Sequence, residues 1–232
     1  MYLATLDRKT IVGSGVTVKI SLFADSMKHV VTGYDAVLKY DPARLRFIEA
    51  RSTLPDFQIF TKVKEGAVVI TGIKALPTPG LTETPTILSD VGLAEISFEP
   101  VSQGTVSVDL DYSYGMTHDS NLVDGSAKDI LTKVQGLKLY LGNGLTLVAG
   151  SETAIDNSTS VKLVEVTGPQ EGCADCIEYA KIEVRSGGNL KTIEFKTGGI
   201  AGLLEIRDEA FGYIFEVEEF TQGAVRLNTA KK

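Results

Sequence analysis

The chain has 232 residues, of which 43% are hydrophobic and 7% are aromatic, and it contains no Trp. This hydrophobic content is typical of one or two folded domains and excludes a disordered chain. The formal net charge of −7 argues against nucleic-acid binding, and no apolar run reaches the roughly 18 residues that a membrane-spanning helix needs. With so few aromatic residues, we expect a core of Val, Ile and Leu, which favours strands.

The clearest predicted strand runs from Gly33 to Tyr40. Its apolar residues at even positions alternate with Asp35, Val37 and Lys39, the period of a strand with one buried face. Asp41-Pro42 then ends the strand, because Pro has no backbone N–H and restricts the residue before it. A second apolar run starts at Leu45, so the sequence predicts two strands joined by a Tyr-Asp-Pro corner.

Further short strands are predicted on both sides of this corner. The segments 57–64 and 67–73 form a predicted hairpin around Glu65-Gly66. The Pro- and Thr-rich stretch 76–90 is predicted to be a long surface loop. With no long amphipathic helix, about nine strands indicate a sandwich for residues 1–142. The remaining predicted strands of this half are 2–12, 16–22, 93–98, 105–112 and 134–141.

The second half is predicted to be a separate, smaller all-β domain. Residues 143–160 are rich in Ser, Thr, Asn and Gly, so we expect a linker there. Residues 161–232 then contain six more alternating segments with Gly-Gly turns between some of them, which favours an immunoglobulin-like sandwich. These segments are 161–166, 177–184, 190–195, 203–206, 211–217 and 224–227.

The only two cysteines, Cys173 and Cys176, form a Cys-x-x-Cys pair. A structural zinc site needs four ligands, and the only histidines, His29 and His118, lie in the other half of the chain. A thioredoxin-like motif needs a helix after the pair, whereas residues 177–184 alternate like a strand. We therefore expect a local disulfide, with free thiols and redox or metal chemistry as the alternatives.

Several segments in the first half carry a family resemblance. The Gly-Tyr-Asp start of the central strand, its Tyr-Asp-Pro corner and the following Leu45 are joined, in order, by Val16–Ile20, Gly92–Phe98 and Asp119–Val123. Together they resemble the core of a cohesin module over about residues 2–142. The resemblance implies a cohesin-like jelly-roll sandwich, close in architecture to carbohydrate-binding modules. The second domain resembles no family that we identify.

The resemblance also implies a binding face. In cohesins, one sheet presents a flat platform that grips the helices of a dockerin partner, and here the two strands of the predicted hairpin would contribute to it. A register shifted by one residue would reverse every assignment and bury Phe60. If Phe57, Ile59 and Val63 point inward, the partner-binding side chains on the outer face are Gln58, Phe60, Lys62 and Thr71.

The sequence contains no recognisable catalytic motif. No G-x-S-x-G elbow, P-loop, dinucleotide fingerprint or H-E-x-x-H helix is present, and His29 and His118 sit among polar residues typical of a surface. We therefore expect no enzyme and no cofactor. The loop Asp119–Gly125 carries oxygen ligands that suit calcium, but it departs from the EF-hand pattern, and a polar loop with turn-forming Asn and Asp explains the same residues.

These observations predict a non-catalytic protein–protein attachment module of a secreted or cell-surface assembly. Its partner would be dockerin-like or another surface protein. The first ten residues lack the features of a signal peptide, so an extracellular location follows from the resemblance alone. One alternative is a self-associating structural subunit of a filament or layer that uses an edge strand such as 2–12. A carbohydrate-binding module is the other alternative, although a planar row of aromatics is hard to build without Trp.

Overall fold

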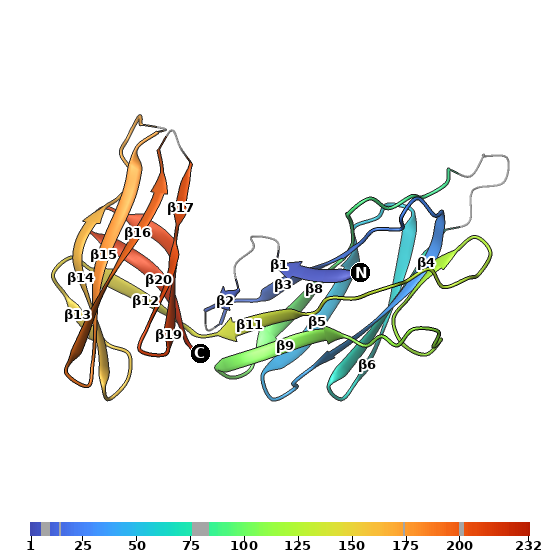
Figure 1. The fold of residues 1–232 in the computed structure, drawn as a ribbon, viewed down its shortest axis with the longest axis horizontal. Coiled ribbons are helices and arrows are strands. Elements are labelled where there is room, and N and C mark those ends of the chain that lie inside the picture. Colours follow the sequence, from blue (N-terminus) through green and yellow to red (C-terminus); the bar gives the residue numbers. More distant parts are fainter. Residues whose placement is uncertain (6–9, 14, 76–83, 174, 200–201) are drawn as a thin grey trace. The chain divides into compact units, whose positions relative to one another are not determined.

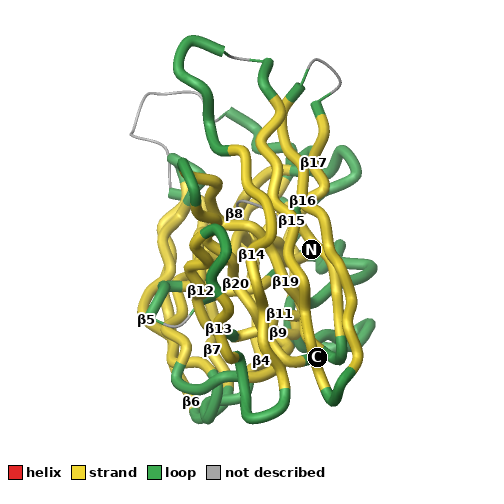
Figure 2. The backbone as a smooth tube through the Cα atoms, turned by 90° about the vertical axis from the view of Figure 1, so that its left-hand side faces the viewer, coloured by secondary structure: helices red, strands yellow, loops and turns green. Residues whose placement is uncertain are grey.

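The computed structural model describes residues 1–5, 10–13, 15–75, 84–173, 175–199 and 202–232. The described residues form strands, turns and loops, and no helix among them could cross a membrane (Figure 2). The predicted all-β class is therefore confirmed. The chain divides into two compact units, Met1–Thr10 with Gly15–Leu139 and Ile11–Ser14 with Tyr140–Lys232 (Figure 1).

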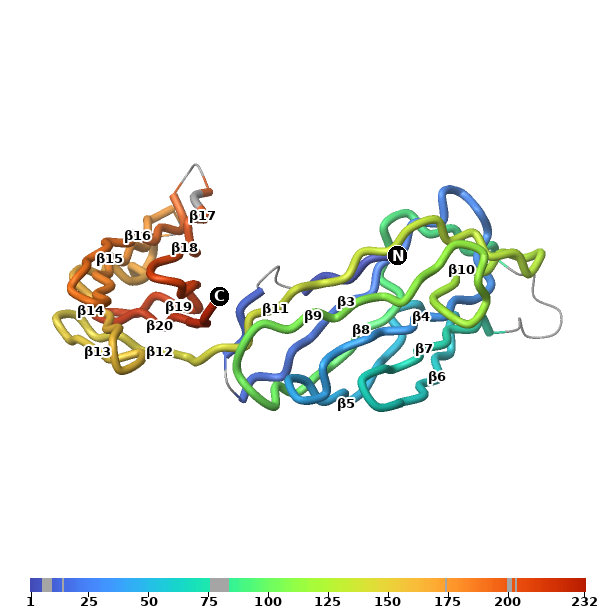
Figure 3. Tube along the Cα trace, turned by 60° about the horizontal axis from the view of Figure 1, so that its bottom comes forward, coloured from blue at the N-terminus to red at the C-terminus, as the bar shows by residue number. Residues whose placement is uncertain are grey.

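The first unit is a sandwich of two sheets. One sheet has the order β1-β3-β8-β5, and the other has the order β2-β11-β9-β4-β7-β6, with β10 also pairing with β4 (Figure 3). Its end strand β2 (Ile11–Val12) pairs with Tyr140 and Leu141 of β11, and these four residues are counted with the second unit. The other ten strands compare with about nine predicted, and β10 is one that the sequence did not predict. The strands are β1 (Tyr2–Thr5), β3 (Val18–Ala24), β4 (Val31–Tyr40), β5 (Leu45–Ser52), β6 (Phe57–Lys64), β7 (Ala67–Lys74), β8 (Val91–Pro100), β9 (Gly104–Leu110), β10 (Asn121–Asp124) and β11 (Leu137–Leu141).

Tyr34 spans the core between these sheets. Only 2% of this residue is exposed, and its hydroxyl donates a hydrogen bond of 3.3 Å from β4 to the carbonyl of Leu93 in β8. Burial raises the pKa of the Tyr34 hydroxyl well above its ordinary value. Gly72 pairs directly with Tyr34 in the sheet, and a Cβ atom at Gly72 would lie 2.1 Å from the Tyr34 ring. The ring therefore occupies the space that a side chain on β7 would need.

The Tyr-Asp-Pro corner forms as the sequence predicts. The carbonyl of Asp41 accepts the backbone N–H groups of Arg44 at 3.0 Å and Leu45 at 2.9 Å, which makes one tight turn between β4 and β5. The Asp41 carboxylate also accepts the N–H of Ala43 at 2.9 Å. Pro42 fits the second position of this turn because no N–H is needed there. Leu45 then enters the core, with 0% exposure.

Part of the predicted loop 76–90 lies outside the described residues, which resume at Thr84. The described part is held against the start of β4, because the N–H of Val31 donates to the carbonyl of Thr86 at 2.8 Å. Leu88 is buried, and its N–H donates to the Ser26 hydroxyl at 3.0 Å. Residues 6–9 of the predicted first strand also lie outside the described residues.

The second unit is a smaller sandwich with the sheet orders β12-β20-β19-β18 and β13-β14-β15-β16-β17. Side chains from both sheets, from Leu147 to Leu227, form one core. The sheets are runs of consecutive strands, apart from β12, so their connectivity differs from the Greek-key connections of an immunoglobulin domain. The strands are β12 (Asn143–Val148), β13 (Glu152–Ala154), β14 (Thr159–Thr167), β15 (Ile177–Ser186), β16 (Asn189–Gly198), β17 (Leu203–Glu205), β18 (Arg207–Ala210), β19 (Tyr213–Thr221) and β20 (Ala224–Lys231).

The predicted linker over residues 143–160 is wrong, because this segment supplies two strands. β12 pairs with β20 along its whole length and buries Leu147 completely, while β13 pairs with β14. The spacing of Leu145 and Leu147 was the strand signal, which the polar composition around it obscured. An N-terminal segment also belongs here: Ile11, in β2 (Ile11–Val12), packs with Ile214 and Ala230.

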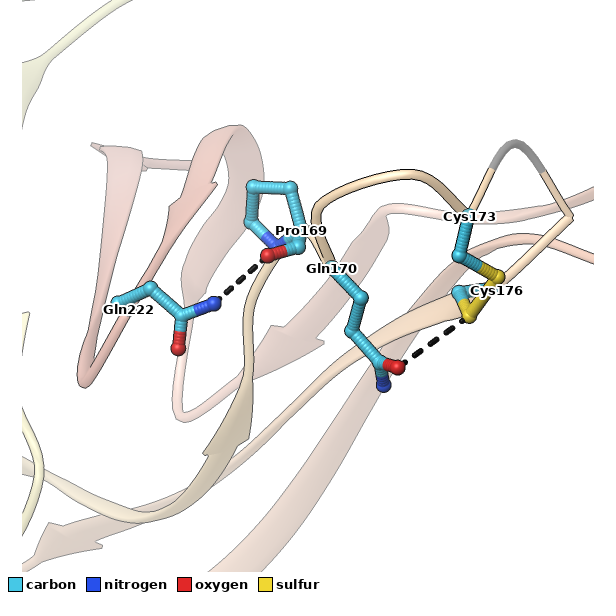
Figure 4. Close-up of a disulfide and its surroundings, with 5 residues drawn as sticks. All are labelled: Pro169, Gln170, Cys173, Cys176 and Gln222. Atoms are coloured by element: carbon cyan, nitrogen blue, oxygen red, sulfur yellow. Dashed lines mark hydrogen bonds between the residues drawn. A yellow bond between two sulfur atoms is a disulfide. The ribbon is translucent and has the colours of Figure 1, made fainter.

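Cys173 and Cys176 form a disulfide in the loop between β14 and β15, with their Cα atoms 5.6 Å apart (Figure 4). The base of this loop is tied to the opposite sheet, because Gln222 Nε2 donates to the carbonyl of Pro169 at 2.6 Å. The Gln170 side-chain oxygen lies 3.4 Å from Cys176 Sγ. No helix follows the pair, since Ile177 begins β15. The disulfide is therefore a local cross-link within a surface loop.

Asp156 organises the turn between β13 and β14. One carboxylate oxygen accepts the N–H groups of Ser158 and Thr159, each at 2.7 Å, and the other accepts the Tyr213 hydroxyl at 2.5 Å. The Tyr213 hydrogen bond, followed by these N–H groups, holds the pKa of Asp156 well below its ordinary value. The same hydrogen bond raises the pKa of Tyr213 to about 12. The carboxylate thus joins the turn to β19 in the other sheet.

We expect Gly72→Ala to lower the free energy of unfolding by about 1–3 kcal/mol or more, because the new methyl group overlaps the Tyr34 ring. Urea unfolding measures this. Gly144→Ala, where a Cβ atom meets nothing within 4 Å, is the matched control within a strand. Exchanging Tyr34 for Leu should make the added methyl group less costly. Equal stability of Gly72→Ala and Gly144→Ala would contradict this account of the core.

We expect Asp156→Asn to lower the melting temperature at pH 7. Because the native pKa of Asp156 lies below its unfolded value of 3.8, the carboxylate contributes stability above about pH 4 and loses it as the pH falls further. The difference in melting temperature between the wild type and Asp156→Asn should therefore become smaller as the pH falls. Thermal melts from pH 7 to pH 3 measure this difference. A difference in melting temperature that does not change with pH would contradict the role of the carboxylate charge.

Candidate protein-binding face

The outer face of the β4-β7-β6 sheet is defined by its strand register. Opposite residues of antiparallel strands point to the same face, and alternate residues point to opposite faces. The buried pair Ala36 and Ile70 lies inward, so the rows on either side of it point outward. Across β4, β7 and β6, the outward rows are Gly33–Ile73–Gln58, Asp35–Thr71–Phe60, Val37–Val69–Lys62 and Lys39–Ala67–Lys64.

The structure brings the four predicted residues Gln58, Phe60, Lys62 and Thr71 onto this one face. Phe57 points inward and is 4% exposed, so the predicted register is correct. Val63 alternates with the inward set but is 56% exposed, because it lies near the end of an edge strand. The part that these residues take in binding stays a prediction.

Two exposed apolar side chains lie beside each other toward the Phe57 end of the face. Phe60 is 57% exposed and Ile73 is 50% exposed, and they occupy neighbouring rows on neighbouring strands. Diagonal neighbours of this kind are within reach of each other's side chains. Sequence reasoning missed Ile73, although its position two residues after Thr71 on the same strand was a sufficient signal. Gly33 lies beside Ile73 in its row and adds no side chain.

Charged residues are distributed unevenly around this apolar pair. The Thr71 hydroxyl donates to the Asp35 carboxylate at 2.5 Å, and Lys39 pairs with Asp111 at 2.8 Å. Lys62 and Lys64 are exposed, and neither forms an ion pair with another described residue. One end of the face therefore carries uncompensated positive charge on a chain whose net charge is −7.

Asp124, in the polar loop Asp119–Gly125, and Asp129, just after it, both hold backbone turns. Asp124 Oδ1 accepts the N–H groups of Ser126 at 2.8 Å and Lys128 at 3.0 Å, and these bonds lower the pKa of Asp124. Asp129 Oδ1 likewise accepts two N–H groups, at 3.0 and 2.9 Å. Within the described part of the chain, no cluster of three or more His, Cys, Asp or Glu side chains is arranged to bind a metal. His29 and His118 are both exposed.

No family model and no curated protein matches the sequence. Among solved structures, the fold is similar to a cohesin module from a Clostridium perfringens glycoside hydrolase, with 12% identity, coverage of 60% of this chain and 93% of that chain, and a TM-score of 0.46. A non-cellulosomal cohesin from the archaeon Archaeoglobus fulgidus has 10% identity, coverage of 60% and 88%, and a TM-score of 0.44. The sixth cohesin of Acetivibrio cellulolyticus scaffoldin B, solved in complex with a dockerin, has 18% identity, coverage of 60% and 96%, and a TM-score of 0.44.

These solved structures belong to the family that the residue motifs of the first half resemble. The likeness is distant in both identity and TM-score. It describes the fold, and the functional proposal below therefore rests on the side chains of this chain. The comparisons do not identify the second unit.

We expect Phe60→Ser and Ile73→Ser each to change the free energy of unfolding by no more than about 0.5 kcal/mol, because half or more of each side chain is already in water. Ile70→Ser, on the same strand but with 0% exposure, should cost about 2–5 kcal/mol. Urea unfolding of the three variants measures these differences. A cost at Phe60 comparable to that at Ile70 would mean that Phe60 belongs to the core.

Proposed function

We propose that this protein is a non-catalytic attachment module that binds a protein partner through the outer face of β4, β7 and β6. The observation that carries the proposal is the exposure of Phe60 and Ile73 beside each other on neighbouring strands of a regularly paired sheet. An apolar cluster bordered by polar residues is the usual anatomy of a protein-binding patch, and a large aromatic side chain is a typical anchor.

The backbone beneath these side chains supports binding without rearrangement. β7 pairs with β4 over seven residues and with β6 over eight, in both cases without a bulge. The face is thus ordered before a partner arrives, and a preorganised surface avoids part of the entropy loss of association. Its partner would be a helical, dockerin-like module or another surface protein, and the assembly would be secreted or on the cell surface. Both details follow from the cohesin resemblance of the sequence.

No specific observation favours either alternative function, the self-associating structural subunit or the carbohydrate-binding module. For a self-associating subunit, the relevant edge is that of β1, which is partly occupied. The N–H of Leu3 donates to the carbonyl of Gln135, and the N–H of Gln135 donates to the carbonyl of Met1, each at 3.1 Å. A self-assembling subunit would need that edge to be free. A carbohydrate-binding module would need a planar row of exposed aromatic side chains. Among the described residues, the strongly exposed aromatics lie on separate elements and do not form such a row: Phe60 on β6, Tyr114 in a loop and Phe211 in a turn.

The proposal is tested by immobilising the full chain and exposing it to the secreted and surface fractions of the source organism. We expect the wild type to capture a discrete partner, and Phe60→Asp and Ile73→Asp to lose it, because a charge at the apolar pair would be desolvated on binding. Met27→Asp is the matched control, since Met27 is 73% exposed in the loop before β4 and lies outside the face.

Mass spectrometry of the captured proteins distinguishes the outcomes. Capture that is equal in all four proteins would place binding elsewhere on the molecule. Recovery of copies of this chain alone would overturn the heterologous-partner proposal and favour a self-associating subunit. Parallel capture with a calcium chelator shows whether a metal takes part in the complex.

A further inference from the structure

A groove of about 590 Å³ lies between the two sheets of the first unit, at their β5 and β6 edges. Its aromatic residues are held firmly: the Tyr40 and Phe47 rings pack edge-on against the buried Phe98 ring, with centroids 5.0 and 5.8 Å apart. Val63 and Val101 are more than half exposed beside them. The apolar residues that line the groove are Tyr40, Pro42, Leu45, Phe47, Val63 and Val101.

β5 and β6, whose tubes lie on the same side of the first unit (Figure 3), differ in the regularity of their pairing. β5 is interrupted by a bulge between Phe47 and Glu49, which leaves Ile48 unpaired with β8 and 48% exposed. A bulge twists an edge and blocks the addition of another strand. β6 is regular from Phe57 to Lys64 and ends its sheet, so its outer row of backbone N–H and C=O groups can pair with a new strand.

The charges on β6 restrict what that strand can be. Lys62 and Lys64 lie on the outer face of β6 and have no ion-pair partner among the described residues. A parallel, in-register copy of β6 would place lysines against lysines, and like charges directly opposite each other destabilise strand pairing. An antiparallel copy centred on Thr61 would place Lys62 and Lys64 opposite Phe60 and Gln58, so it would neutralise neither cation. An acidic strand would instead neutralise both cations.

We propose that the free edge of β6 binds an extended peptide as an added strand, with its apolar side chains in the groove and its acidic side chains beside Lys62 and Lys64. Side chains of a strand alternate between faces, so one that pairs with β6 would direct every second residue toward Val63 and the groove, and the others toward the lysines. The recognised chemistry is therefore a strand of alternating apolar and acidic residues.

This site shares β6 and the lysines Lys62 and Lys64 with the proposed protein-binding face, but its groove lies on the inward side of β6. The groove is lined by Tyr40 and the corner after it, the start of β5, the end of β6 with its turn at Glu65-Gly66, and Val101, whereas Ile73 lies on β7, one strand inside the edge. Ile73→Asp should therefore leave peptide binding unchanged. Val101→Asp should weaken peptide binding, because a carboxylate there removes apolar surface from the groove. These two variants distinguish failure of one proposal from failure of the other.

The test titrates the full chain with an acetylated and amidated heptapeptide of alternating Val and Glu, up to about 1 mM, a concentration that detects binding weaker than ordinary protein–protein affinity. Backbone amide NMR reports the site. We expect shifts at β6 and at the groove residues, and an affinity at least about tenfold above that of the same peptide with Lys in place of Glu. A peptide of identical composition with Val and Glu in blocks should bind more weakly, because it does not alternate.

Charge-reversed variants complete the experiment. Lys62→Glu with Lys64→Glu should invert the preference, so that the Lys peptide binds more tightly than the Glu peptide. Lys28→Glu with Lys133→Glu makes the same change in net charge at exposed positions outside the groove and should leave affinity within about twofold. The proposal is overturned if the Glu peptide produces no shift at β6, if both control peptides bind equally, or if β6 shifts with protein concentration alone.

Discussion

The register of the first unit depends on the contact between Tyr34 and Gly72. The two residues are opposite each other on β4 and β7, and the Tyr34 ring fills the space that a Cβ atom on Gly72 would occupy. A slip of one residue would place Ile73 or Thr71 beneath the ring, where no side chain fits. Because strand faces alternate, this single pairing also determines that Asp35, Thr71 and Phe60 point outward together. The core contact and the binding face are therefore two consequences of one register.

The exposed face carries few apolar residues, and two lysines lie on its edge strand β6. Phe60 and Ile73 are surrounded by polar or small neighbours, and lysines end two of the rows. On the other sheet, the bulge in β5 interrupts a second edge. Both features oppose uncontrolled strand pairing, and they leave β6 as a regular edge whose pairing depends on the charge of the incoming chain.

Alternation along single strands made much of this predictable from the sequence. The hairpin around Gly66, the corner at Pro42 and the outward set Gln58, Phe60, Lys62 and Thr71 all follow from local pattern and turn chemistry. What could not be predicted arises from pairing between distant segments. β10 has only four residues and is a strand because it pairs with β4. β12 likewise is a strand because it pairs with β20. The groove likewise depends on the spacing of two sheet edges, which no local pattern encodes.

The interleaved path of the backbone has a consequence for dissecting the molecule. The chain passes from one unit to the other after residues 10, 14 and 139, so no single break in the polypeptide separates two intact modules. A fragment that starts at Asn143 would lack Ile11 and Tyr140, which cover Ile214 and Ala230. Cleavage at one point would thus leave Ile11 exposed on the N-terminal piece, and Ile214 and Ala230 exposed on the C-terminal piece.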